Sequence, residues 1–299
     1  MPEYPDITVY VERLSARTRG TVLKTIQLRS FFLLRTVTPP LAAFHGRTVR
    51  SVARMGKRIV FDFSDDYFLV FHLMILGRLH WKESGTDVPK SALAGLAFTN
   101  GVLLLTEQGK EKRASLHAIH GADALSAIDP GGLEVLSSTL DEFRARIRSE
   151  NHTLKRSLTN PTLFSGIGNA YSDEILHRAR LSPVSLTRSL DDDAVARLYD
   201  AIRSVLAEWT ERLRAEAGEG FPDKVTAFRP EMAVHGKYEK PCPACGTSVQ
   251  RIRYASNETN YCPTCQTNGK LLADRALSRL LKSDWPSTVA ELESRRRGR

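Results

Sequence analysis

The sequence lacks any run of about 18 apolar residues, the length that a helix needs to span a bilayer. Its first residues also lack the basic segment and the apolar segment of a secretory signal. No internal repeat indicates a solenoid or a propeller. We therefore expect no membrane segment and a cytoplasmic location, in a bacterial-type cytosol with its nucleoid.

Cysteine is scarce, with four residues among 299. A reducing cytoplasm disfavours disulfides and leaves thiolates available to a metal. The four cysteines follow the pattern C-x2-C-x16-C-x2-C, whereas a redox motif needs only one pair. Two tight pairs can surround a tetrahedral ion, and a site filled by protein ligands is structural. We predict one structural Zn²⁺ held by Cys242, Cys245, Cys262 and Cys265.

Acidic residues are fewer than basic ones, 34 against 43, which gives a formal net charge of +9. This charge favours a polyanionic partner such as a nucleic acid. An acidic protein partner or a solubilising surface is another explanation of the charge, so the motifs have to decide.

The chain changes character along its length. A helix is expected after Asp6, a candidate N-cap, and short strands follow over residues 21–107, which is typical of a β-sandwich. Beyond the Asp-Pro-Gly-Gly stretch at 129–132 the pattern is helical, and its clearest helix covers residues 192–213. Between the cysteine pairs, segments 248–254 and 258–261 suit a hairpin that zinc would fix. The fold class is thus α+β and multidomain.

The N-terminus carries the residue types of a nucleophilic centre. Removal of Met1 would make Pro2 a secondary amine that forms an iminium with a sugar aldehyde carbon, with Glu3 beside it. Lys57 precedes an expected strand, although any exposed lysine fits that description. In the Gly-Ile-Gly-Asn stretch 166–169, backbone amides before a helix can bind a phosphate, or the glycines form a tight turn between helices.

In their order, these motifs resemble the formamidopyrimidine-DNA glycosylase and endonuclease VIII family of DNA repair enzymes. The resemblance covers residues 2–266. It rests on Pro-Glu-Tyr-Pro-Asp at 2–6, Gly-Lys at 56–57, Lys155 ahead of Gly-Ile-Gly-Asn-Ala-Tyr at 166–171, and Val-His-Gly-Lys at 234–237.

The resemblance implies four parts. These are an N-terminal catalytic β-sandwich with a flanking helix (1–130), a helix-two-turns-helix DNA-binding domain (131–233), a zinc-finger hairpin (234–270) and a C-terminal extension of unassigned role (271–299). In the family such parts grip duplex DNA around a damaged base flipped out of the stack, because the glycosidic carbon cannot be reached inside it.

The resemblance also assigns roles to residues. Pro2 attacks the anomeric carbon, Glu3 protonates the opening sugar ring, and Lys57 lies at the phosphate that is eliminated. Phosphate contacts fall to a further set, His72, Lys155 and Asn169. Met74, Ile75 and Leu76 would fill the space left by the flipped base, unless they are buried core at the end of a strand.

Two departures from the family pattern matter. Family members carry a finger arginine five positions before the third cysteine, where it contacts a DNA phosphate. In this sequence that position is Asn257. The change predicts weaker DNA binding or a stalled second elimination, unless Arg251, Arg253 or the basic tail compensates. The arginine and phenylalanine of purine-specific members have no clear match within residues 107–116. This resembles the endonuclease VIII branch, which favours oxidised pyrimidines, and leaves the substrate open.

We therefore predict a monomeric, bifunctional DNA glycosylase and apurinic/apyrimidinic-site lyase that acts on oxidised bases in damaged double-stranded DNA. The alternative is a lesion-binding protein of the same architecture with impaired chemistry. A zinc-ribbon RNA-binding or transcription factor would explain the finger and the charge but not the N-terminus.

Overall fold

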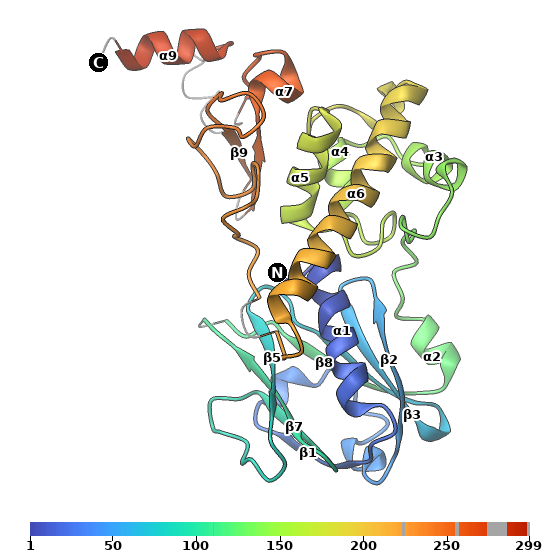
Figure 1. The fold of residues 1–299 in the computed structure, drawn as a ribbon. Coiled ribbons are helices and arrows are strands. Elements are labelled where there is room, and N and C mark those ends of the chain that lie inside the picture. The colour runs from blue at the N-terminus through green and yellow to red at the C-terminus, as the bar shows by residue number, and fades with distance from the viewer. Residues whose placement is uncertain (110, 223–224, 255–256, 274–285, 298–299) are drawn as a thin grey trace. The chain divides into compact units, whose positions relative to one another are not determined.

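The computed structural model describes residues 1–109, 111–222, 225–254, 257–273 and 286–297 (Figure 1). The chain forms two compact units. The first comprises Met1–Gly131 with Ala207–Ala227, and the second comprises Gly132–Leu206 with Phe228–Arg299. Among the described residues, no helix has both the length and the apolar character needed to cross a membrane.

The first unit is a sandwich of two four-stranded antiparallel sheets, ordered β1-β6-β7-β5 and β2-β3-β4-β8. The strands are β1 (Leu23–Leu28), β2 (Val49–Met55), β3 (Arg58–Phe63), β4 (Tyr67–His72), β5 (Gly77–Lys82), β6 (Ala94–Phe98), β7 (Val102–Glu107) and β8 (Ser115–His120). Short helical segments are η1 (Phe31–Leu33), η2 (Leu41–Phe44), η3 (Ser64–Asp66) and α2 (Ala122–Ser126).

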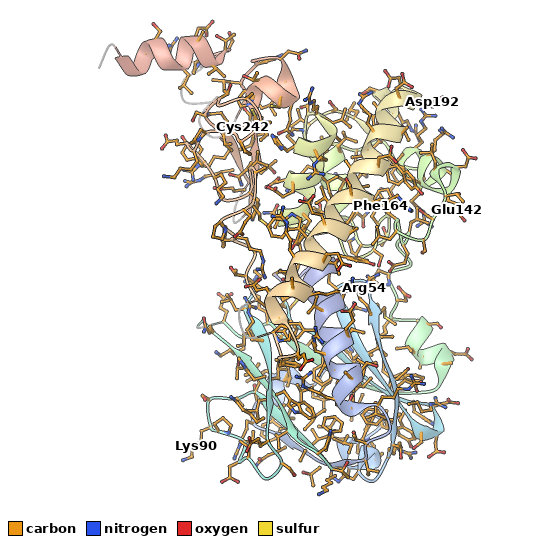
Figure 2. The ribbon with its side chains drawn as sticks, in the orientation of Figure 1. Arg54, Lys90, Glu142, Phe164, Asp192 and Cys242 are labelled. Atoms are coloured by element: carbon orange, nitrogen blue, oxygen red, sulfur yellow. The ribbon has the colours of Figure 1, made fainter. Side chains whose placement is uncertain are left out.

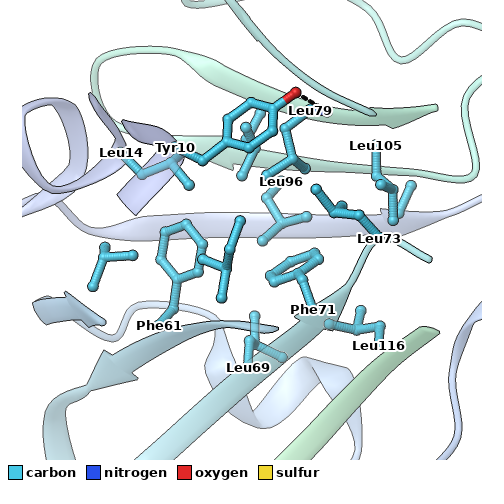
Figure 3. Packing of buried hydrophobic residues seen from close by; sticks show 14 of the residues in the cluster. Tyr10, Leu14, Phe61, Leu69, Phe71, Leu73, Leu79, Leu96, Leu105 and Leu116 are labelled. Atoms are coloured by element: carbon cyan, nitrogen blue, oxygen red, sulfur yellow. Dashed lines mark hydrogen bonds between the residues drawn. The ribbon is translucent and has the colours of Figure 1, made fainter. Parts of the chain in front are cut away.

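The core of this unit lies between the two sheets (Figure 3). Phe61 and Phe71 meet edge to face with ring centroids 5.7 Å apart, a geometry that aromatic quadrupoles favour. Tyr10 of helix α1 (Tyr4–Thr18) is fully buried, and its hydroxyl accepts a hydrogen bond from the Leu79 N–H at 3.4 Å. This bond and the apolar face of α1 attach the helix to the sandwich.

Helix α1 begins earlier than the sequence suggests. Its N-cap is Glu3, so Asp6 lies three residues inside the helix and the prediction of Asp6 as N-cap is wrong. Asp6 instead reaches back: its Oδ2 accepts the Glu3 N–H at 3.0 Å. Pro5 is tolerated in the first turn because the first N–H groups of a helix have no intrahelical partner.

The end of α6 (Asp192–Ala217) and the loop after it belong to the same unit. Phe221 packs on Tyr10 with ring centroids 5.5 Å apart. The guanidinium of Arg214 donates from Nε to Glu12 at 2.9 Å, and this pairing raises the pKa of Arg214. These contacts add to the support of α1.

The second unit contains helices and a hairpin. The helices are α3 (Leu140–Arg148), α4 (Leu154–Thr159), α5 (Asn169–Ala179), η4 (Thr187–Ser189), the first part of α6, α7 (Pro263–Thr267) and α9 (Val289–Arg297). The predicted apolar stripe of α6 is buried, as Val195, Leu198 and Ile202 illustrate. Strands β9 (Gln250–Tyr254) and β10 (Asn257–Tyr261) pair antiparallel.

The expected fold class is confirmed: a β-sandwich with its helix, a helical region, and a C-terminal hairpin with the cysteine cluster. Beyond the finger, Leu271 N–H donates to the Ser287 carbonyl at 2.9 Å and Lys270 forms a bridge with Thr288. The four-part division of the chain stays a prediction.

Candidate functional site

The start of the chain is packed into the first unit. Pro2 is buried and Glu3 is 1% exposed. The α-amine of Met1 has a pKa below its ordinary value, chiefly because burial disfavours its charged form, and the nearby Arg78 and Lys57 act in the same direction. An amine placed here therefore has more of the neutral, nucleophilic form than one in water.

Lys57 lies in the two-residue turn between β2 and β3, after Gly56 with φ +60°. Such turns need a positive φ, which glycine adopts without strain. Arg54 of β2 (labelled in Figure 2) donates to the Gly56 carbonyl at 2.8 Å and lies 4.1 Å from the ring centroid of Tyr4. Arg54 thereby joins the turn that carries Lys57 to the first residue of α1.

The Lys57 amine and the Glu3 carboxylate are electrostatic neighbours. Burial lowers the pKa of Lys57, and the charge of Glu3 partly opposes that shift. The structure thus brings together the three residues predicted to carry the chemistry, Pro2, Glu3 and Lys57, in one region of the first unit.

His72 ends β4, directly opposite Arg58 of β3 and Ser115 of β8. Burial lowers the pKa of His72 to about 4, and the charges of Arg58 and Lys57 act in the same direction. The ring is therefore neutral near pH 7. His72 can form hydrogen bonds with a phosphate but brings no positive charge to it.

The turn formed by Met74, Ile75 and Leu76 projects from the sandwich. Met74 has φ +51°, Ile75 is 50% exposed and Leu76 is 38% exposed. Their alternative interpretation as buried core is therefore wrong for Ile75 and Leu76. The Gln108 N–H donates to the Leu76 carbonyl at 3.4 Å, so the β7–β8 loop lies against this turn.

Arg78 is a site residue that the sequence reasoning missed. Its guanidinium donates to the Gly77 carbonyl at 2.7 Å and to the Ile75 carbonyl at 3.2 Å, and its charge acts on the Met1 amine. It therefore links the exposed turn to the chain's start. A lone arginine in a strand belongs to no motif, so the sequence carried no signal for it.

In the second unit, Lys155 of α4 and Asn169 of α5 are also brought together. Lys155 Nζ donates to the Asn169 carbonyl at 2.6 Å and to Asp173 Oδ1 at 2.5 Å. Asn169 Nδ2 donates to the Glu258 carbonyl of β10 at 3.0 Å. The glycine-rich turn, the following helix and the finger hairpin are thus joined.

Asp173 and Glu174 hold the finger, a role that the sequence did not reveal. Asp173 is fully buried, and its Oδ2 accepts from His235 Nδ1 at 2.8 Å and from the Asn260 N–H at 3.1 Å. Glu174 accepts the N–H groups of residues 233–235 at 2.8–2.9 Å. Burial raises the pKa of Glu174, and these three backbone donors oppose the shift.

Asn257, at the position of the family's finger arginine, is the first residue of β10. The backbone of Asn257 pairs with Tyr254, while its side chain lies outside the described part of the chain. Arg251 pairs with Glu258 at 3.2 Å and lies 4.0 Å from the Tyr238 ring centroid. Arg253 is more exposed and lies 3.9 Å from Glu258, so it is the better placed of these two candidates to reach a phosphate.

The four cysteines form the predicted metal site. Their sulfur atoms all lie within 4.8 Å of one another, and Cys245 and Cys262 are 3.4 Å apart. Tetrahedral zinc with Zn–S bonds of about 2.3 Å needs sulfurs about 3.8 Å apart, so the cluster fits one structural Zn²⁺. His177 Nε2 lies 3.2 Å from Cys242 Sγ, where an N–H can donate to a thiolate ligand.

Comparisons with known proteins agree with this arrangement. Residues 1–112 match the formamidopyrimidine-DNA glycosylase N-terminal domain, 132–216 its H2TH domain, and 239–268 the zinc finger found in FPG and IleRS. A formamidopyrimidine-DNA glycosylase of Pelotomaculum thermopropionicum is 30% identical over 277 residues, covering 89% of this chain and 99% of the relative.

A second relative is less complete. An uncharacterized formamidopyrimidine-DNA glycosylase-like protein of Mycobacterium tuberculosis is 38% identical over 156 residues, which cover 52% of this chain and 95% of the relative.

Two solved structures extend the likeness. MutM (Fpg) of Thermus thermophilus is similar with a TM-score of 0.74 and 31% identity, covering 89% of this chain and 98% of that protein. Fpg (MutM) of Lactococcus lactis in complex with Fapy-dG-containing DNA has a TM-score of 0.78 and 26% identity, covering 89% of this chain and 100% of that protein.

Proposed function

The chain belongs to the formamidopyrimidine-DNA glycosylase family, and from this premise we propose that it is a bifunctional DNA glycosylase and apurinic/apyrimidinic-site lyase. It excises oxidised bases from damaged duplex DNA through a Schiff base on its N-terminal proline. The observation that supports this most is the burial of Pro2 and Glu3 beside the Lys57 amine.

The first step is displacement of the base. After Met1 is removed, the neutral Pro2 amine attacks C1′ of the sugar, and the glycosidic electron pair leaves with the base. The departing base takes up the proton that the Pro2 nitrogen loses. Glu3 gives a proton to the ring oxygen as the sugar opens, which produces an iminium between Pro2 and C1′. Burial at the start of the chain favours the neutral amine that this attack needs.

The second step is strand cleavage. The iminium draws electrons from C1′ and makes a C2′ proton acidic; loss of that proton breaks the C3′–oxygen bond and releases the phosphate. Lys57 provides positive charge where that phosphate lies. The desolvation that lowers the pKa of Lys57 also strengthens its attraction for a phosphate oxygen.

Each unit offers residues that can contact DNA. The neutral His72 bonds a phosphate without a charge, and Ile75 and Leu76 enter the duplex as the wedge. Lys155 already pairs with Asp173, so it positions Asn169 and the helix behind it. The Asn169 amide has a second N–H that can bond a phosphate while the first holds Glu258.

A second candidate function is a lesion-binding protein with impaired chemistry. Asn257 favours it, because a neutral amide cannot replace an arginine in charge-assisted bonds to the lesion phosphate. Met74, Ile75 and Leu76 and the finger would serve such a protein equally well. The two functions differ in whether the protein releases a base and cleaves the strand.

The test is an incision assay on duplexes that contain an abasic site, 8-oxoguanine or an oxidised pyrimidine. We expect strand breaks with wild-type protein and none with a variant whose N-terminal extension holds the Pro2 nitrogen in a peptide bond, because an amide nitrogen cannot form the Schiff base. Cys262→Ser is the matched control: its DNA affinity falls, but saturating protein still cleaves. Binding of all three duplexes without any cleavage would support the lesion-binding alternative instead.

A further inference from the structure

The segment between β1 and η2 carries an exposed aromatic pair. Phe31 is 84% exposed and Phe32 is 82% exposed, and Val37 in the same segment is 93% exposed. Isolated apolar side chains on a surface are ordinary, but several together mark a binding surface. None of the chemistry proposed above uses these side chains.

The backbone under this pair is fixed. The N–H groups of Arg29 and Ser30 donate to the Leu93 carbonyl, Arg35 N–H donates to the Leu116 carbonyl at 2.9 Å, and Thr36 Oγ1 accepts from the Ala118 N–H at 2.8 Å. Leu33, between these anchors, is buried in the sandwich core. Phe31 and Phe32 are therefore presented on a rigid support, which lowers the entropy lost when they bind something.

The surroundings of the pair are basic. Residues 29–37 contain two arginines, Arg29 and Arg35, and no acid, and both arginines are exposed. Leu34 pairs with Leu116 and packs on the core, so Arg35 projects to the opposite, outer face of the sheet. That face carries His117 of β8, whose pKa is lowered by burial and then by Arg58 and Arg35.

The same face leads to the catalytic region. Arg58, His72 and Ser115 are direct neighbours across β3, β4 and β8, and His117 lies two residues beyond Ser115 on the same face. Lys57, Arg58 and Arg35 thus lie along one row with the imidazoles of His72 and His117 among them, and Arg35 belongs to the same anchored segment as Phe31 and Phe32. A polyanion bound along this row therefore comes to the segment that carries Phe31 and Phe32.

We propose that Phe31 and Phe32 form a stacking platform for unpaired bases of the DNA strand whose backbone lies along this basic row. Aromatic side chains beside a positive track are how proteins bind single strands, since every base has a face that can stack. The inference rests on the proposed function, because the bound strand is the lesion-bearing DNA. It specifies that a lesion beside unpaired bases, as in a bubble within a duplex, is bound more tightly than the same lesion in fully paired DNA.

The experiment compares two substrates with the same stable abasic analogue, one in a fully paired duplex and one inside a five-nucleotide bubble. Affinities are measured by fluorescence anisotropy for wild type and for the Phe31→Ala/Phe32→Ala double variant. We expect the double variant to lose roughly tenfold or more in affinity for the bubble and little for the paired duplex.

Two controls separate stacking from general apolar contact. Val37→Ala, on the same segment, should leave bubble affinity unchanged, and Phe31→Trp/Phe32→Trp should retain it, with tryptophan fluorescence quenched on binding. Equal affinities for wild type and the double alanine variant would overturn the proposal, as would an equal loss in Val37→Ala. A change in self-association without a change in bubble affinity would overturn it too, and would assign the surface to a second copy of the chain.

Failure of this inference is distinct from failure of the proposed function. The abasic analogue cannot be cleaved, so the affinities do not depend on Pro2. Retained strand cleavage of paired lesion duplexes by the double alanine variant would keep the enzyme assignment whether or not the platform exists.

Discussion

The backbone N–H of Glu3 donates to Oδ2 of Asp6 at 3.0 Å, in the first turn of α1. This bond fixes the residue that follows Pro2, and in the proposed mechanism it orients the N-terminal amine toward the sugar. The first turn of α1 therefore positions the residue next to the proposed nucleophile.

Asp6→Ala should slow base release by up to roughly 100-fold, because small displacements of reacting groups are costly. It should also cost about 0.5–2 kcal/mol of stability through the lost helix cap. The measurements are single-turnover kinetics and thermal unfolding. Glu142→Ala is the control, since Glu142 caps α3 through the Thr139 N–H at 2.7 Å; a similar loss of activity there would contradict the positioning role of Asp6.

The imidazole of His72 should titrate near pH 4 in an NMR titration of the folded protein. An unfolded histidine binds its proton near pH 6.5, so between these values the unfolded state holds more protons than the native state. Stability should therefore fall as pH drops from about 6.5 to about 4, and His72→Gln should reduce that fall. A His72 midpoint near its ordinary value would contradict the lowered pKa and would leave part of the ring charged near pH 7.

Asp173→Ala should destabilise the second unit by about 3–5 kcal/mol, because the largely buried Lys155 amine loses the carboxylate that it pairs with. The pairing of His235 and Asn260 with the same carboxylate is lost as well. Chemical denaturation measures the effect. The double variant Asp173→Ala/Lys155→Met should recover part of the loss, and no recovery would argue against the ion pair as its cause.

His177→Ala should weaken zinc retention by about 10-fold to 100-fold, since removal of a group that bonds a ligand typically has that effect. A chelator competition assay with a colorimetric zinc indicator gives the affinity. Arg178→Ala, on the exposed side of the same helix, should leave zinc retention unchanged. Equal zinc affinities for wild type and His177→Ala would show that the contact between His177 and Cys242 does not contribute to zinc retention.

Asn257→Arg should increase the fraction of products that have undergone the second elimination, because a guanidinium can bond the lesion phosphate bidentately. Denaturing gels that separate the two kinds of 3′ end measure this fraction. Arg253→Ala should lower it in the wild-type background if Arg253 compensates for Asn257. Unchanged product ends in Asn257→Arg would remove this explanation.

The sandwich and α6 were predictable because their periodicities are strong. Alternation marks the strands, and Val195, Leu198 and Ile202 recur at helical spacing on one buried face. The start of α1 was misplaced because Glu3 is not a usual N-cap residue, and Asp6, which is, acts from inside the first turn.

The interior contacts of the site were less accessible from sequence. Asp173 bonds Lys155 and Asn260, which lie 18 and 87 positions away in the sequence. No local pattern predicts contacts between residues so far apart. Three adjacent apolar residues, Met74 to Leu76, fit a core strand as well as a turn. The positive φ of Met74 and the exposure of Ile75 and Leu76 become visible only in the folded chain.

The most direct test of the account is borohydride trapping on a duplex with an abasic site, followed by mass spectrometry of the cross-linked peptide. We expect one covalent adduct on Pro2 of a chain that has lost Met1. The adduct should be absent from a variant whose N-terminal extension holds the Pro2 nitrogen in a peptide bond, and retained in Lys57→Ala. An adduct on a lysine, or tight binding without any adduct, would contradict the proline Schiff base.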